Sequence, residues 1–162
     1  MAEQSAQGWW VVVLSFFCAI LLNIVPVPEW MQWARPEWVA LVLIYWVIAL
    51  PQRIGVVTAW LLGMLLDSLE GAVLGQNALS LSVVAYFSTI LYQRLRMYAI
   101  WQQAMVVCIL IAINQFIGQW VQNLSGSGAA SLLFLLPALV SALLWPWVML
   151  LLRHLRRHYR VN

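Results

Sequence analysis

The segment Gly55–Gly75, GVVTAWLLGMLLDSLEGAVLG, decides the fold of this chain. It is almost entirely apolar, yet it carries Asp67 and Glu70 in its second half. An ionisable side chain within a membrane helix is costly and normally faces other protein or a wet cavity. The sequence therefore predicts a membrane helix around which others pack, with Asp67 turned inward.

Small residues recur at every fourth position of this segment, and Asp67 holds one place in the series. The series is Gly55, Ala59, Gly63, Asp67, Gly71 and Gly75. Small residues four apart allow two helix backbones to approach closely. Because each four-residue step turns a straight helix by about 40°, six such positions cannot form one seam. We predict a packing patch at Ala59 and Gly63, and a helix end and turn shaped by Asp67, Gly71 and Gly75.

The composition indicates a membrane protein with one domain over residues 1–162. Hydrophobic residues make up 65% of the chain and charged residues 8%, against about 45–50% and about 25% in soluble domains. Mean hydropathy is +0.90. The formal charge of +3 comes from arginine alone, and in a membrane protein such an excess indicates orientation and contact with anionic lipid rather than nucleic acid.

Apolar runs separated by polar or proline-containing breaks predict an all-α protein with six transmembrane helices. The predicted spans are 8–25, 30–50, 54–72, 74–92, 99–121 and 132–152, followed by a basic tail at 153–162. Residues 38–50 alone are too short for a hydrocarbon core of about 30 Å, so we extend that span back to residue 30. If Pro51 only kinks one long helix, the count falls to five. The N-terminus lacks a basic region and a cleavage site, so we expect the first span to be permanent.

The arginines predict the orientation. In the six-span arrangement Arg35 lies alone on one side, and the other seven arginines lie on the opposite side. These seven are Arg53, Arg94, Arg96, Arg153, Arg156, Arg157 and Arg160. Because basic loops stay in the cytoplasm, both termini are predicted to be cytoplasmic. The tail arginines Arg153, Arg156, Arg157 and Arg160 are expected to contact anionic lipid, or a cytoplasmic protein.

The sequence shows no catalytic motif. It has no glycine-rich phosphate loop, no nucleophile elbow and no metal-ligand spacing, so we expect no enzymatic activity, no cofactor and no metal. His154 and His158 are four residues apart, but their place in the basic tail favours a solvated pair. Asp67 and Glu70 are three apart, and proton or cation handling by this pair is the alternative to a structural role for Asp67.

A partner for Asp67 follows from depth in the membrane. Counted from the predicted starts of their spans, Asp67 and Gln115 lie about 20 Å and about 24 Å along their helices. The glutamines of that later span recur on one helical face. The candidate partners of Asp67 are therefore Asn77, Gln115 and Gln119.

Several motifs, in order, resemble the MreD family of rod shape-determining proteins of Gram-negative bacteria, over nearly the whole chain. The motifs are Arg35-Pro36-Glu37-Trp38, Tyr45-Trp46, Ala49-Leu50-Pro51-Gln52-Arg53, Gly63-Met64-Leu65-Leu66-Asp67, Gly71, Leu74-Gly75, Trp101-Gln102-Gln103-Ala104 and Leu144-Trp145-Pro146-Trp147. The glycine–aspartate run is the most specific of them.

The resemblance implies a non-enzymatic inner-membrane component of the cell-elongation complex, which controls cell shape and lateral peptidoglycan synthesis. It implies binding to the scaffold MreC, support of RodA with its class B penicillin-binding protein, and an indirect link to MreB. The helix arrangement of the family is also similar to that of the S components of vitamin transporters. The alternative function is therefore a membrane subunit that binds a vitamin-like small molecule in a cavity near Asp67, and a proton-linked transporter is less favoured.

Overall fold

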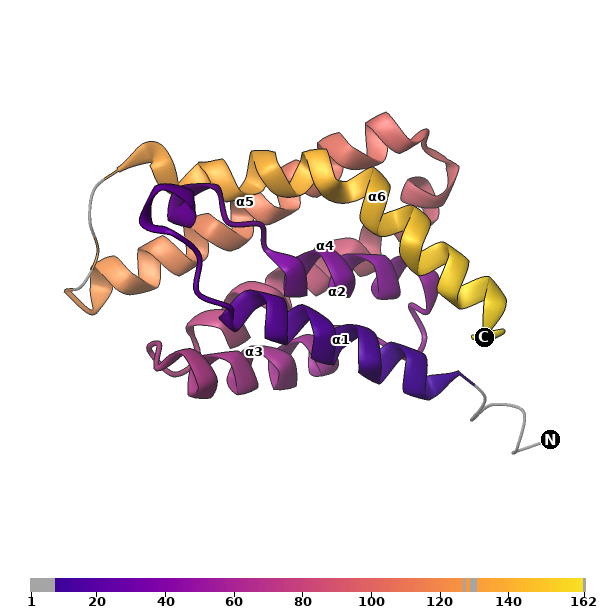
Figure 1. Cartoon of the computed structure of the whole chain (residues 1–162), viewed down its shortest axis with the longest axis horizontal. Coiled ribbons are helices and arrows are strands. Elements are labelled where there is room, and N and C mark those ends of the chain that lie inside the picture. The colour runs from indigo at the N-terminus through magenta and orange to yellow at the C-terminus, as the bar shows by residue number, and fades with distance from the viewer. Residues whose placement is uncertain (1–7, 127, 129–130, 162) are drawn as a thin grey trace.

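The computed structural model describes residues 8–126, 128 and 131–161, and the regular elements in this part of the chain are all helical. Figure 1 shows the arrangement. The helices are α1 (Trp9–Ile24), α2 (Trp38–Ala49), α3 (Val56–Glu70), α4 (Gln76–Met97), α5 (Ile100–Leu124) and α6 (Leu136–His158), with short 3₁₀ helices η1 (Glu29–Ala34) and η2 (Leu132–Leu135). The all-α prediction is confirmed. By length and composition, two helical stretches, Ile100–Leu124 and Leu132–His158, could cross a membrane, and α1 is a shorter apolar helix.

A turn at Pro51 separates α2 from α3. The N–H groups of Arg53 and Ile54 both donate to the Leu50 carbonyl, at 3.1 and 3.0 Å. The alternative of one long helix kinked at Pro51 is therefore wrong. The predicted continuous helix over 30–50 is also wrong, because residues 35–37 are non-helical between η1 and α2.

The most deeply buried helix is α2. Ten of its 12 residues are buried, and it is in contact with α1, α4 and α6. Its sequence, WVALVLIYWVIA, is apolar on every side, which is typical of a helix enclosed all round. The centre of the fold is thus α2 and not the Gly55–Gly75 segment, contrary to our expectation.

In contrast, α3 packs on one side only. Its main neighbour is α4, with a smaller contact to α1. The buried residues of α3 are Ala59, Gly63, Leu66 and Asp67. These positions fall on one helical face, so the glycine–aspartate motif is the inward stripe of an outer helix.

Helix α5 extends three residues beyond its predicted span, and α4 and α6 extend further, into regions that we expected to be a polar connection and a basic tail. Helix α4 continues to Met97 with Arg94 and Arg96 in its last turn, and α6 continues through Pro146 to His158. Cationic side chains near a helix C-terminus interact favourably with the helix dipole. The basic residues therefore prolong these helices.

Figure 1 shows the two ends of the bundle, and the residues at these ends differ in charge. The Asp67 end comprises the end of α3, the start of α4, the end of α5 and residues 29–37. The arginine end comprises the end of α4, the end of α6 and the turn after α2. The first and last described helices meet at the arginine end, where the rings of Trp10 and Tyr159 are 4.6 Å apart.

Candidate functional site: the Asp67 cap and the adjoining polar cavity

The Asp67 carboxylate caps the first turn of α4. Its Oδ2 atom accepts hydrogen bonds from the backbone N–H groups of Gly75 (2.9 Å) and Ala78 (3.4 Å), and its Oδ1 atom accepts one from the N–H of Asn77 (3.0 Å). The side chain is only 1% exposed. Both carboxylate oxygens are thus held by the backbone of a neighbouring helix.

The backbone around α4 explains why this cap comes from another helix. The first N–H groups of any helix lack intrahelical partners, and this end carries partial positive charge. The N-cap of α4 is Gly75, in a left-handed conformation (φ +95°) and with no side chain to supply an acceptor. The Asp67 side chain supplies this acceptor from α3. The backbone carbonyl of Asp67 accepts a hydrogen bond from the Ala72 N–H (3.2 Å), which spans the left-handed Gly71. One residue therefore organises the α3–α4 connection.

Gly63 lies in the seam between α3 and α4, and Ala59 lies one turn earlier on the same buried face of α3. A Cβ atom on Gly63 would lie 2.3 Å from the Cα atom and 2.4 Å from the backbone nitrogen of Ala78, and Ala59 is fully buried. Close approach here brings the Asp67 carboxylate to the start of α4. The predicted packing patch is thus used within the chain and is not available to a partner helix.

The glutamines of α5 have other partners. The Gln115 amide donates to the Glu37 carboxylate, and the Gln119 amide donates to Asn123 Oδ1 at 3.4 Å. Of the three candidate partners, Asn77 contacts Asp67, and it does so through its backbone N–H group. The side-chain amide of Asn77 donates to Glu70 Oε2 at 3.3 Å. The structure thus pairs Gln115 with Glu37 and not with Asp67.

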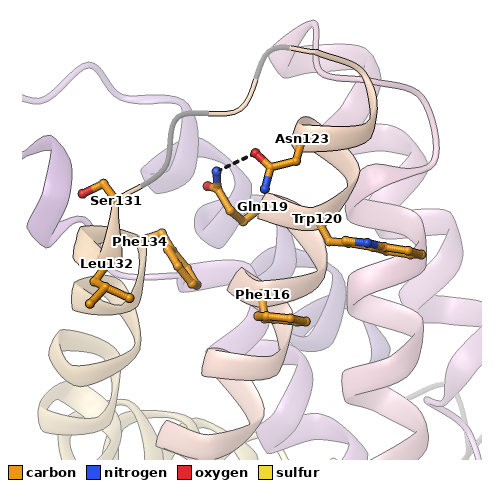
Figure 2. Close-up of a pocket in the computed structure, with 7 residues that line it drawn as sticks. All are labelled: Phe116, Gln119, Trp120, Asn123, Ser131, Leu132 and Phe134. Carbon is orange, nitrogen blue, oxygen red and sulfur yellow. Dashed lines mark hydrogen bonds between the residues drawn. The ribbon is translucent and has the colours of Figure 1, made fainter.

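Gln119 borders a separate, mainly apolar hollow of about 400 Å³ between the end of α5 and η2. Figure 2 shows its Nε2 atom directed at Asn123, beside Phe116, Trp120 and Phe134. None of the described residues that line this hollow carries a carboxylate or guanidinium group. It offers shape but little polar recognition, so the polar chemistry of the Asp67 end is elsewhere.

A polar cavity of about 560 Å³ lies beside the first turn of α4. Side chains from α1, α3, α4, α5 and the segment before α2 line it. Its polar lining residues are Asn23, Arg35, Glu37, Glu70, Gln76, Asn77, Ser80, Asn114, Gln115 and Gln122. The carboxylate of Glu70 accepts from the Asn23 amide at 2.7 Å as well as from Asn77, so it is already engaged.

Two groups lining this cavity have unsatisfied hydrogen-bonding atoms. The Nε and Nη2 atoms of Arg35 and the Oδ1 atom of Asn114 are buried and have no hydrogen-bond partner among the described residues. Asn114 is only 6% exposed. Buried polar atoms in native proteins are nearly always hydrogen-bonded. The two side chains thus line the cavity with polar atoms that the described residues leave unpaired.

Sequence reasoning did not identify Arg35, Glu37 or Asn114 as site residues. A signal was present: Asn114, Gly118 and Gln122 recur at every fourth residue, and all three line the cavity. The glutamine series that we used instead is divided between two sites. Gln119 borders the hollow in Figure 2, whereas Gln115 and Gln122 line the cavity.

The tail arginines lie at the far end of the bundle. Arg153, Arg157 and Arg160 are exposed and Arg156 is half-buried. Arg153 and Arg156 face a hollow together with Arg96. Among the described residues, no group of three or more His, Cys, Asp or Glu side chains is placed to hold a metal ion.

Comparison with known proteins identifies the family. A family model described as rod shape-determining protein MreD matches residues 4–155. A rod shape-determining protein MreD of Haemophilus influenzae is 35% identical over 154 residues, which cover 94% of this chain and 95% of that protein. No solved structure gives a significant match, so similarity to the S components stays a prediction. With this match over nearly its whole length, the chain belongs to the MreD family of rod shape-determining membrane proteins.

Proposed function

We propose that this protein is a multi-pass component of the bacterial inner membrane that supports lateral peptidoglycan synthesis by assembly and not by catalysis. The family match over residues 4–155 carries the proposal. The geometry of Asp67 supports it, because a carboxylate that accepts three backbone N–H groups serves the fold and is poorly placed to act as a base.

The proposed topology has six spans with the arginine end in the cytoplasm. The turn with Arg53, the end of α4 with Arg94 and Arg96, and the end of α6 gather seven of the eight arginines at one end of the bundle. Basic residues flanking membrane helices remain cytoplasmic. The contact between Trp10 and Tyr159 agrees with both termini on that side.

The proposed partners are MreC, through its membrane helix, and RodA with its class B penicillin-binding protein, with MreB linked indirectly. Because the α3–α4 seam is closed by Gly63 against Ala78, a partner helix has to use a lipid-facing surface. One concave apolar surface is the groove of about 740 Å³ between α5 and α6, where Leu143 and Trp147 are each 74% exposed.

The test is rescue of rod shape combined with crosslinking. In a strain that lacks its own MreD, we expect this chain to restore rods and to be recovered with MreC. A photoreactive residue at Leu143 or Trp147 is compared with one at Val57 or Leu61 of α3, which are 74% and 57% exposed. Cells that stay round with a well-expressed chain would contradict the proposed function, and crosslinks from α3 alone would move the contact away from the α5–α6 groove.

One observation favours the second candidate function, a subunit that binds a vitamin-like small molecule. This observation is the cavity with unsatisfied Arg35 and Asn114 atoms. A ligand that binds only the native state raises the unfolding temperature. Stabilisation by a vitamin that disappears in Asn114→Leu, with no rescue of rod shape, would favour this candidate over the first.

A further inference from the structure

A second polar hollow lies at the arginine end, between α2, α4, α5 and α6. Its volume is about 360 Å³, and its polar lining residues are Tyr45, Arg96, Gln103, Arg153 and Arg156, with Trp145 at its floor. Three guanidinium groups from two helices thus face one space. The proposed function leaves this arrangement unexplained.

Two of these arginines are fixed by the backbone. Arg96 donates from Nε and Nη2 to the Ile48 carbonyl, at 2.9 and 2.7 Å, and from Nη2 to the Ala49 carbonyl at 3.1 Å. Arg156 donates from Nε to the Val161 carbonyl at 3.4 Å. Neither contact uses the Nη1 groups. These cations are thus positioned before any ligand arrives, which reduces the entropy lost on binding.

The floor of the hollow is rigid and buried. Gln103 is 5% exposed and Trp145 is 1% exposed. The Gln103 amide donates to the Leu95 carbonyl at 2.7 Å, and its Oε1 atom accepts from the Trp145 indole N–H at 3.3 Å. Because these polar groups satisfy one another, the arginines are the main groups left to recognise a ligand.

Among the described residues that line the hollow, no carboxylate balances its charge. The acidic residues that the structure describes lie at or near the Asp67 end, and they are Glu29, Glu37, Asp67 and Glu70. Guanidinium groups match phosphate oxygens in geometry and in charge. A ligand with a phosphate and no ammonium group suits this hollow best, because its described lining holds three guanidinium groups and no carboxylate to pair with an ammonium.

We propose that this hollow binds the phosphate group of an anionic membrane lipid. The apolar side chains of Ile48 and Met149 border the same space, which suits a headgroup that enters together with its acyl chains. The site differs from general attraction of the basic tail to lipid, because it uses Arg96 of α4 and excludes Arg157 and Arg160. It does not depend on which partners the protein has.

The test is native mass spectrometry of the full-length protein in detergent, with phosphatidylglycerol or phosphatidylethanolamine added. Arg153→Gln/Arg156→Gln removes two charges inside the hollow, and Arg94→Gln/Arg160→Gln removes two outside it. We expect the wild type to retain phosphatidylglycerol, the first double variant to bind it about tenfold more weakly, and the second to stay within about twofold of the wild type. Arg153→Gln alone is a further variant that keeps the hydrogen bond from Arg156 to the Val161 carbonyl. Because Arg153 is exposed, this change should weaken lipid binding without disturbing the fold.

The outcomes separate the sources of phosphate. Displacement of the lipid by millimolar glycerol phosphate would support a phosphate site open to soluble ligands, and resistance to it would support a lipid site. Equal weakening in both double variants would overturn the proposal, as would equal retention of the two lipids. Circular dichroism of each variant checks that the helices remain folded.

Discussion

The two ends of the bundle use charge at helix termini in opposite ways. At one end the anionic Asp67 caps the N-terminus of α4, and at the other the cationic Arg96 caps the C-terminal carbonyls of α2. Both complement a helix dipole. Asp67 is 1% exposed whereas Arg96 is exposed. Water can replace Arg96 but has little access to the N–H groups that Asp67 satisfies, so loss of Asp67 is expected to cost more.

The largest effect should come from filling the seam that brings Asp67 to α4. In Gly63→Ala the new Cβ would lie 2.3 Å from the backbone of Ala78, so α3 and α4 have to separate. Overpacking against backbone is expected to cost about 3 kcal/mol or more. Thermal unfolding in detergent measures this loss.

The matched control for this seam is Gly55→Ala. Gly55 also belongs to the four-residue series, but a Cβ there would have no neighbour within 4 Å. Its unfolding midpoint should stay close to that of the wild type. Equal losses in the two variants would show that the cost of Gly63→Ala does not come from the seam.

Removal of the cap itself should have the next largest effect. Asp67→Ala leaves three buried N–H groups without an acceptor and is expected to cost about 2–3 kcal/mol. Asp67→Asn keeps one oxygen, so it should cost about 1–2 kcal/mol. The measurement is the same unfolding midpoint, with rod-shape rescue as a second readout. Full stability of Asp67→Asn together with lost rescue would favour a role for the charge itself.

The sequence predicted much of this end of the molecule. Gly71 marks a real helix end, and the sequence predicts Asp67 as a structural anchor beside a packing patch. The kind of partner was not predictable. Motif spacing identifies side chains only. The first backbone N–H groups of α4 lack a hydrogen-bond acceptor because its N-cap is a glycine, and only the folded turn reveals that N-cap.

A smaller effect is expected at the arginine end. Arg96→Gln removes the donors to the Ile48 and Ala49 carbonyls, but the exposed position lets water take their place. We expect a loss of about 1 kcal/mol, measured by thermal unfolding. A loss as large as that of Asp67→Ala would mean that exposure does not explain the difference between the two ends.

The smallest effect on stability should come from Asn114. Its Oδ1 atom is unsatisfied, so Asn114→Leu removes an uncompensated polar atom while keeping a similar volume. The change should lie within about 1 kcal/mol of zero, and it should favour the folded state if the cavity is empty in the purified protein. A marked loss would show that a tightly held molecule satisfies Asn114.

The interior was the harder part to predict. By length, residues 38–50 are too few to cross a membrane on their own. They form the 12-residue helix α2, which is the enclosed centre of the bundle. Uniform apolarity shows that a helix is buried but not among which neighbours. Depth along a helix likewise does not give the direction of a side chain, and Gln115 donates to Glu37 and not to Asp67.

Hydrogen exchange at the start of α4 tests the central claim most directly. The backbone N–H groups of Gly75, Asn77 and Ala78 donate to the Asp67 carboxylate, so they should be protected from exchange. In Asp67→Ala, exchange at residues 75–78 should accelerate by about tenfold or more, while the last turns of α4 and α6 keep their wild-type rates. Unchanged exchange at residues 75–78 would contradict the claim that Asp67 is the cap of α4.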